Sequence, residues 1–235
     1  MFDRKFFYIG VFLAALFVVI FLLVNFKISY NFDVTLFKLI NEKLNVPALD
    51  SFFTSVAIYG REYFWVPVVA LMWILGSVFR NEKAKKGALM LVIIFIAIII
   101  IGLSLKAVYY RPRPFLNPTL SGISHVLVPK DLDSSFPSGH ALVVAGGAAT
   151  AYLFLRKRYS IPLVAEAALV SYSRVYVGVH YPTDVLAGII LGVAIAFIIY
   201  AILNKNKYFD KVFALINSVQ TKFLSILKIT NNIYN

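Results

Sequence analysis

Three short polar clusters interrupt an otherwise apolar chain, and each carries residue types that can handle phosphate. The first is the stretch 136–140, Phe-Pro-Ser-Gly-His, which opens onto a long apolar run. Backbone N–H groups at a helix start bind anions, and histidine exchanges protons near neutral pH. Ser138 and Gly139 are thus candidates for an anion cradle beside His140, although Ser138 could simply cap a helix.

The second cluster contains two cations, Lys106 and Arg113, at the end of another apolar run. Pro114 ends any helix at Arg113, so the arginine can turn back toward the lysine. Cations at the end of a membrane span either reach the interface or meet an anion. An interfacial anchor and a phosphate-binding pair are both consistent with this cluster taken alone.

The third cluster runs from Ser173 to Asp184 and contains Arg174 and His180. Pro182 suits the first position of a helix, which places Asp184 in the first turn. From there its carboxylate can accept a hydrogen bond from the imidazole, fix one tautomer and leave the other nitrogen as a nucleophile. A surface histidine and a capping aspartate would explain either residue singly, but explain the set poorly.

Composition identifies the setting of these clusters as a membrane. The chain has 235 residues, of which 60% are hydrophobic and only 14% charged, and its mean hydropathy is +0.82. These values exclude an ordinary soluble domain and indicate a polytopic membrane protein. The net charge of +12 falls in short clusters between apolar runs, which favours membrane topology over nucleic-acid binding. Without cysteine, thiol chemistry is excluded.

We expect an all-α fold, a single membrane-embedded domain over residues 1–235, with a bundle of six transmembrane helices. Six apolar segments approach the roughly 20 residues that a helix needs to cross a bilayer. They are 7–26, 63–79, 88–110, 139–155, 161–178 and 184–203. The fourth and fifth are short, so both are expected to lie buried among the others.

The lysines and arginines between spans predict an orientation. The loops after the second, fourth and sixth spans are strongly basic: Arg80, Lys83, Lys85, Lys86, Arg156, Lys157, Arg158, Lys205, Lys207 and Lys211. The loop 27–62 instead balances its cations, Arg61 among them, with acidic residues such as Asp33. Because basic loops stay in the cytoplasm, both termini are expected there. All three polar clusters then lie on the extracytoplasmic side.

Segments outside the spans are amphipathic. Residues 32–44 and 49–58 place apolar side chains at helical spacing among charges, which predicts interfacial helices. The tail 208–229 repeats the pattern, with Phe209, Phe213 and Leu227 on one face. This tail is expected to lie along the cytoplasmic leaflet or to pack against the bundle.

Together, the three clusters resemble the signature of the type-2 phosphatidic acid phosphatase superfamily. Residues 106–114 match Lys-x6-Arg-Pro, residues 137–140 are Pro-Ser-Gly-His, and residues 173–184 match Ser-Arg-x5-His-x3-Asp. The three parts occur in the right order without a departure, across about a third of the chain. The size and plain architecture are similar to those of small prokaryotic polyprenyl diphosphate phosphatases.

The resemblance implies a mechanism. His180 attacks phosphorus to form a phosphohistidine, Asp184 orients it, and His140 protonates the leaving group and then activates water. The phosphoryl oxygens are held by Lys106, Arg113, Ser138, Gly139 and Arg174, and the scheme requires no metal or other cofactor.

The resemblance also implies a lipid substrate in the membrane, and the expected reaction is hydrolysis of undecaprenyl or dolichyl diphosphate to the monophosphate. Phosphatidic acid, phosphatidylglycerophosphate or transfer to another acceptor remain alternatives, and a non-catalytic transporter or scaffold is the alternative of a different class. His125 matches no motif. The 22-residue loop between Pro114 and Pro137 is expected to form a lid or rim.

Overall fold

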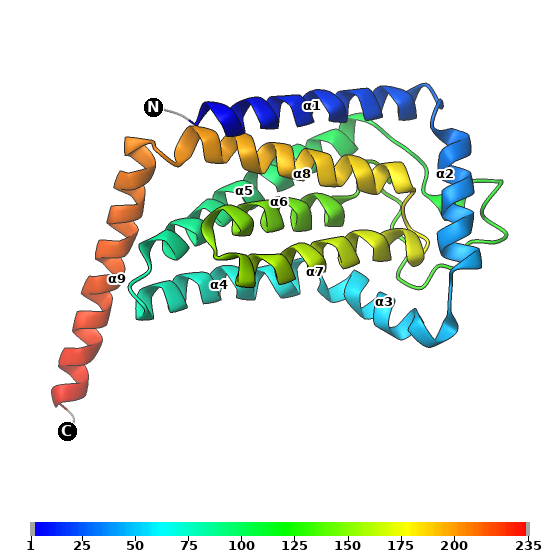
Figure 1. Cartoon of the computed structure of the whole chain (residues 1–235). Coiled ribbons are helices and arrows are strands. Elements are labelled where there is room, and N and C mark those ends of the chain that lie inside the picture. Colours follow the sequence, from blue (N-terminus) through cyan, green and yellow to red (C-terminus); the bar gives the residue numbers. More distant parts are fainter. Residues whose placement is uncertain (1–2, 234–235) are drawn as a thin grey trace.

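The structure, a computed structural model, describes residues 3–233 and is built from helices (Figure 1). In chain order they are α1 (Arg4–Asn25), α2 (Tyr30–Phe37), the π-helical η1 (Lys38–Lys43), α3 (Pro47–Tyr59), α4 (Glu62–Val78), α5 (Glu82–Val108), the 3-10 turn η2 (Pro114–Leu116), α6 (Gly139–Phe154), α7 (Lys157–Tyr176), α8 (Pro182–Leu203) and α9 (Lys207–Ile233).

The long helices α1, α4, α5, α6, α7 and α8 run side by side along one direction (Figure 1). Each coincides with one of the six expected spans. Among residues 3–233, three helices are both long and apolar enough to cross a membrane, namely α1, α5 and α8, while α4 and α6 are shorter apolar helices. The all-α membrane fold is confirmed, and the count of six crossings stays a prediction.

The bundle has two different ends. At one end α2 lies across the bundle, and at the other end α9 leaves it at a steep angle (Figure 1). We call these the α2 end and the α9 end. The basic loops meet at the α9 end, where Lys86 pairs with Asp210 at 2.6 Å and Lys85 bonds Asn217 and Gln220.

Helices α6 and α8 approach each other closely because glycines line their contact. A Cβ on Gly188 would lie 2.6 Å from the carbonyl oxygen of Ser138, and one on Gly192 would collide with the carbonyl of Leu142. Small residues let membrane helices touch backbone to backbone. This close contact, which we call the α6–α8 seam, places the start of α6 beside the start of α8.

The expectation that both short spans are buried is correct for α6 and only partly so for α7. Most of α6 lies inside the bundle, from Ala141 to Phe154. The first half of α7 instead exposes Ile161 and Val164, and burial becomes continuous only from Ser173 to Tyr176. Helix α7 therefore lines the outside of the bundle and turns inward at the α2 end.

The segment between α1 and α4 is helical, as expected, but it is not a simple surface layer. Asp33 of α2 and Asn41 of η1 are fully buried, and Phe37 is 1% exposed. Asn41 bonds the carbonyl oxygens of His125 and Tyr176 at 2.9 and 2.7 Å. Helix α2 and η1 thus form a cap docked onto the α2 end, and they turn polar side chains inward.

The tail helix α9 combines the two expected arrangements. Phe209 and Phe213 near its start are buried against the bundle, where the rings of Phe213 and Trp73 meet edge to face. Farther along, Val219 and Phe223 are each 59% exposed, and the helix projects away from the bundle (Figure 1). The side chain of Leu227 lies outside the described residues.

Candidate active site

All eight residues singled out in the sequence lie at the α2 end. Lys106 is in the last turn of α5, and Arg113 follows in the extended segment after it. Ser138 directly precedes α6, Gly139 begins it and His140 lies in its first turn, while Arg174 lies in the last turn of α7. His180 lies between α7 and α8, and Asp184 is in the first turn of α8. Four different helices therefore supply one site.

The segment that carries Arg113 is extended because of its prolines. Helix α5 ends at Val108, two residues before the expected boundary, and Tyr109 is already extended. Arg111 and Arg113 each precede a proline, which disfavours helical geometry at both positions. The chain therefore turns away from the axis of α5 and brings Arg113 toward His180.

The imidazole of His180 is held in one tautomer. The side chain is 2% exposed, and its Nδ1 lies 2.8 Å from the carbonyl oxygen of Ser135. A carbonyl only accepts, so Nδ1 carries the proton and Nε2 keeps its lone pair. Nε2 lies 3.5 Å from Nη1 of Arg113, which also donates to the carbonyl of Val179 at 3.1 Å. The free nitrogen therefore faces a guanidinium that binds phosphate readily.

Burial and positive charge keep this imidazole neutral. Burial is the largest cause, followed by Arg113, Arg174 and Lys106, and together they lower the pKa of His180 well below its ordinary value. Both causes penalise the imidazolium form. The lone pair on Nε2 therefore remains available in mildly acidic as well as neutral solution.

Asp184 lies beside His180 but does not accept a hydrogen bond from its imidazole, which corrects the expectation from the sequence. Its Oδ2 is 3.7 Å from Nδ1, longer than a hydrogen bond, because the carbonyl of Ser135 occupies that direction. Oδ2 instead accepts from the N–H of Tyr181 at 2.9 Å, which closes the first turn of α8. Asp184 fixes the backbone next to His180 rather than the ring directly.

The start of α6 offers polar groups that the protein itself does not use. Ser138 is the residue before the first helical turn, yet its hydroxyl makes no capping bond. The hydroxyls of Ser138 and Ser135 are both buried and have no hydrogen-bond partner among the described residues. Simple helix capping therefore does not explain Ser138. Its backbone N–H donates to the carbonyl of Asp184 at 3.0 Å, across the α6–α8 seam.

The cations cluster around the two histidines. Lys106 lies 2.6 Å from Asp133, and Arg113 pairs with the other oxygen of the same carboxylate. Arg174 is 5% exposed and donates to the carbonyl of Ala57 at 3.0 Å. His140 is partly buried within electrostatic range of Arg174, Lys106 and His180. All three cations thus act electrostatically on His180, and Lys106 and Arg174 act on His140 as well.

The loop before α6 closes over these cations. Burial alone would raise the pKa of Asp133, but hydrogen bonds from Lys106 and Arg113 outweigh it and hold this pKa below its ordinary value. The carboxylate is 51% exposed, so it covers the cations from the solvent side. This contact fits the expected rim. His125 contacts Asn41 through its backbone, which agrees with its absence from the site.

A second polar network, which the sequence did not reveal, lies behind Asp184. Arg111 donates to Asp184 at 2.5 Å, to Asp33 at 2.7 Å and to Thr183 at 2.9 Å. Asp33 also accepts from the N–H and hydroxyl of Thr183, at 3.0 and 2.7 Å. Burial alone would lower the pKa of Arg111, but the two carboxylates hold it above its ordinary value. We call these four residues the Arg111 cluster.

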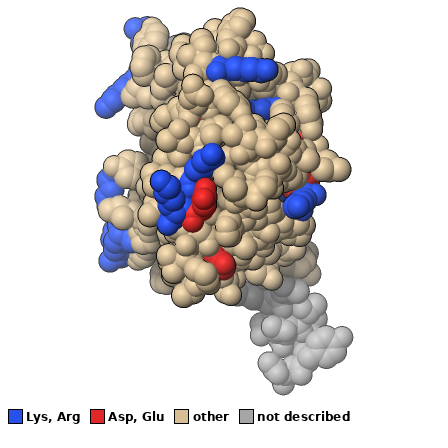
Figure 2. All heavy atoms as spheres, turned by 90° about the vertical axis from the view of Figure 1, so that its right-hand side faces the viewer, with Lys and Arg blue, Asp and Glu red and all other residues tan. Residues whose placement is uncertain are grey.

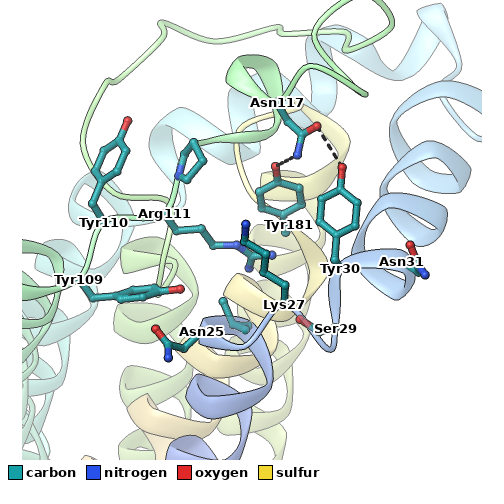
Figure 3. A pocket seen from close by; sticks show the side chains of 12 residues that line it. Asn25, Lys27, Ser29, Tyr30, Asn31, Tyr109, Tyr110, Arg111, Asn117 and Tyr181 are labelled. Atoms are coloured by element: carbon teal, nitrogen blue, oxygen red, sulfur yellow. Dashed lines mark hydrogen bonds between the residues drawn. The ribbon is translucent and has the colours of Figure 1, made fainter.

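A cavity of about 580 Å³ opens on the other side of the Arg111 cluster (Figure 3). Arg111 reaches into its centre and lies 4.1 Å from the ring of Tyr181. Asn117 bridges the hydroxyls of Tyr181 and Tyr30 across the top of the cavity, at 3.0 and 3.4 Å. Arg111 and Tyr181 therefore form a wall between this cavity and the residues around His180.

Seen from the α2 end, basic and acidic side chains meet in a cluster amid a largely uncharged surface (Figure 2). The sequence profile of the PAP2 superfamily matches residues 85–208, which contain all eight site residues. The chain belongs to the PAP2 superfamily. An undecaprenyl-diphosphatase from Sulfolobus acidocaldarius is 42% identical over 198 residues, covering 83% of this chain and 90% of that protein.

Two further PAP2 relatives agree with this assignment. Undecaprenyl-diphosphatase BcrC from Bacillus subtilis is 34% identical over 64% of this chain and 75% of its own. The crystal structure of a transmembrane PAP2 type phosphatidylglycerolphosphate phosphatase from Bacillus subtilis superposes with a TM-score of 0.67, at 26% identity, over 82% of this chain and 94% of that one. The protein is therefore a membrane PAP2 lipid phosphatase.

Proposed function

We propose that the protein hydrolyses a polyprenyl diphosphate, undecaprenyl or dolichyl, to the monophosphate through a phosphohistidine on His180. The observation that carries this proposal is the fixed tautomer of that residue. Nδ1 donates to Ser135 while Nε2 keeps its lone pair and faces Arg113. An imidazole held neutral with one free nitrogen beside a guanidinium is a nucleophile next to a phosphate-binding group.

The first half of the proposed reaction uses this arrangement. Nε2 of His180 forms a bond to the terminal phosphorus, and the bond from phosphorus to the bridging oxygen breaks. His140 donates a proton to that oxygen as it leaves. Lys106, Arg113 and Arg174 neutralise the charge on the phosphoryl oxygens while the bond breaks.

The second half returns the protein to its starting state. A water molecule gives a proton to His140, its oxygen attacks the phosphohistidine, and phosphate departs. The hydroxyl of Ser138 and the N–H of Gly139 are the groups at the start of α6 that would hold the phosphoryl oxygens in both halves. Asp184 keeps the backbone beside His180 in place.

The proposal includes no metal ion. Within residues 3–233 no cluster of three or more histidine, aspartate or glutamate side chains is arranged to hold one. The three cations and the start of α6 supply the positive charge that a metal would otherwise contribute. Activity is therefore expected to persist when divalent ions are chelated.

The choice of substrate rests on the relatives. Two of them are undecaprenyl-diphosphatases by name, at 42% and 34% identity. A phosphatidylglycerophosphate phosphatase of the same fold supports the alternative that the lipid is a monophosphate ester. Phosphatidic acid and transfer to another acceptor remain further alternatives, because the same phosphohistidine would serve them.

Phosphate release in detergent with EDTA tests the mechanism. Wild-type protein is expected to release phosphate, and His180→Ala is expected to release none above background. His125→Ala is the matched control, because that histidine lies at the same end and contacts Asn41 only through its backbone in the bonds described. Activity that survives in His180→Ala would refute the phosphohistidine, and vanadate is expected to inhibit competitively.

Comparing substrates tests the identity of the lipid. We expect a higher kcat/KM for undecaprenyl diphosphate than for phosphatidic acid or phosphatidylglycerophosphate, each presented in the same detergent. Equal values for all three would exclude a dedicated diphosphatase. Phosphorylation of an added lipid acceptor in place of phosphate release would instead identify a phosphotransferase.

The orientation in the membrane is part of the same proposal. We place both termini in the cytoplasm, because the basic loops at the α9 end are expected on the cytoplasmic side by the positive-inside rule. The site at the α2 end then lies on the extracytoplasmic side. A reporter fused after Asn235 is expected to be active only in the cytoplasm. An extracytoplasmic reading would invert the arrangement.

A further inference from the structure

A fourth cation faces the site from α4, outside the sequence signature. Arg61 is the residue immediately before α4, and its Nη1 lies 3.9 Å from the point that a Cβ on Gly139 would occupy. The guanidinium therefore stands next to the first residue of α6. In the sequence, Arg61 counted only as one charge among several in the loop 27–62.

Arg61 lies on the His140 side of the site. Its charge acts on both His140 and Arg174. The carboxylate of Asp133, by contrast, pairs with Lys106 and with Arg113, whose guanidinium lies 3.5 Å from Nε2 of His180. Arg61 and Arg174 are close enough to repel each other, so an anion bound beside them is favoured.

In the proposed reaction, diphosphates and monophosphate esters present different leaving groups beside His140. His180 attacks the terminal phosphorus, and the leaving group departs on the side of His140. When the substrate is a diphosphate, the leaving group is a lipid monophosphate that carries negative charge of its own. When the substrate is a monophosphate ester such as phosphatidic acid, the leaving group is the alcohol diacylglycerol, which carries no second phosphate. A cation beside His140 can therefore distinguish the two classes.

We propose that Arg61 binds the lipid-linked phosphate of a diphosphate substrate and so selects diphosphates over monophosphate esters. This inference rests on the proposed phosphatase function. As the bond to the bridging oxygen breaks, its electron pair stays on that oxygen and the proton comes from His140. Arg61 neutralises the charge on the phosphate that leaves with the lipid, and it makes no bond to the phosphoryl group that His180 takes.

The test compares two substrates in one variant. In Arg61→Gln, kcat/KM for undecaprenyl diphosphate is expected to fall at least about tenfold, the loss typical of a hydrogen bond to a charged group. For phosphatidic acid the fall is expected to stay below about threefold, which also shows that the variant is folded. Arg158→Gln is the matched control, since this exposed arginine lies at the opposite end of α7.

Each other outcome is decisive. Equal losses on both substrates would assign Arg61 to the shared phosphoryl site, and no loss on either substrate would remove it from recognition, so either result overturns the inference. A wild-type protein inactive on both lipids would refute the proposed function itself. If Arg61→Gln does not accumulate, Arg61→Lys is measured instead. Its shorter reach is expected to lower the diphosphate preference, and an unchanged preference would again overturn the inference.

Discussion

Two arginines that are two residues apart, Arg111 and Arg113, bind carboxylates in opposite ways. Arg111 is enclosed by Asp33 and Asp184, whose side chains have no exposed surface. Arg113 is equally buried but pairs with Asp133, a loop carboxylate that is 51% exposed. One guanidinium is saturated by permanent partners, and the other is covered by a partner that water already reaches.

The difference suggests separate roles for the two arginines: Arg111 maintains the fold, and Arg113 is proposed to bind substrate. A buried pair whose hydrogen bonds are complete holds its geometry, and breaking it leaves an uncompensated charge. An exposed carboxylate on a buried arginine can be replaced by another anion at small cost. The Arg111 cluster therefore positions the start of α8, whereas in the proposed mechanism Arg113 exchanges Asp133 for a phosphoryl group.

The largest effect is expected from removing the permanent cation. Arg111→Leu leaves Asp33 and Asp184 buried without their partner, and we expect it to destabilise the fold by about 3–5 kcal/mol. Thermal unfolding in detergent measures the change. Arg158→Gln, at the other end of the bundle, is the control. A variant as stable as wild type would show that the Arg111 cluster contributes no structural constraint.

Removing Arg113, the cation whose carboxylate partner is exposed, is expected to affect catalysis and not folding. Arg113→Gln should lower kcat by about 100-fold to 1,000-fold, the usual cost of losing a donor to the transition state. Its unfolding midpoint should stay close to that of wild type because Asp133 is free to turn toward water. A fall in stability comparable to that of Arg111→Leu would erase the distinction between the two arginines.

A smaller effect is expected when one permanent partner loses its charge. Asp33→Asn keeps the shape of the side chain but weakens its bonds to Arg111 and Thr183, which should cost about 1.5–3 kcal/mol of stability. Activity should fall with it, because Asp33 reaches the start of α8 through Thr183. Unfolding and kcat measured together decide the matter, and full activity at reduced stability would confine the role of Asp33 to folding.

The pH profile tests the electrostatics around His180. Burial and the neighbouring cations lower the pKa of His180, so its neutral form persists at pH values below 6.5. The acid limb of kcat/KM should therefore lie below that pH. In Lys106→Met one positive neighbour is lost, the pKa should rise, and the limb should move to higher pH on the same substrate. If the acid limb does not move in the variant, the pH dependence of kcat/KM does not come from ionisation of His180.

The smallest effect is expected from the exchangeable carboxylate itself. Asp133→Asn removes the negative charge that covers Lys106 and Arg113, so phosphate no longer competes with it. We expect KM to fall about threefold, with kcat nearly unchanged, because an exposed ion pair contributes little energy. Measured KM values for wild type and variant suffice. A raised KM would mean that Asp133 helps to bind the substrate.

The sequence predicted most of the fold and the immediate site because both leave local patterns. Apolar runs of membrane length located the helices of the bundle within a few residues. The Pro-Ser-Gly turn at the start of α6 and the proline that begins α8 were visible as turn and helix signals. The eight signature residues were singled out by residue type and by their match to the family signature, and the structure places them at one end of the bundle.

The supporting residues could not be predicted because their partners are distant in the chain. Asp33 lies 78 positions from Arg111, and nothing near either residue indicates the other. Asp33 also belongs to a segment whose pattern favoured a surface helix, so its complete burial has no local signal. Arg-Pro occurs twice in residues 111–114, so Arg111 and Arg113 have the same local sequence, which does not indicate that their partners differ.

The α6–α8 seam also sets the spacing between the residues at the starts of the two helices. In the proposed mechanism the general acid, His140, lies in the first turn of α6 and the nucleophile, His180, lies just before α8, so the α6–α8 seam sets how far apart the two histidines are held. A single methyl group at Gly188 would wedge the helices apart by forcing Ser138 away. The glycines thus fix the spacing of the two helices at the site. To accommodate a bulkier substrate, substitutions should be made in the loop that forms the rim and not at these glycines.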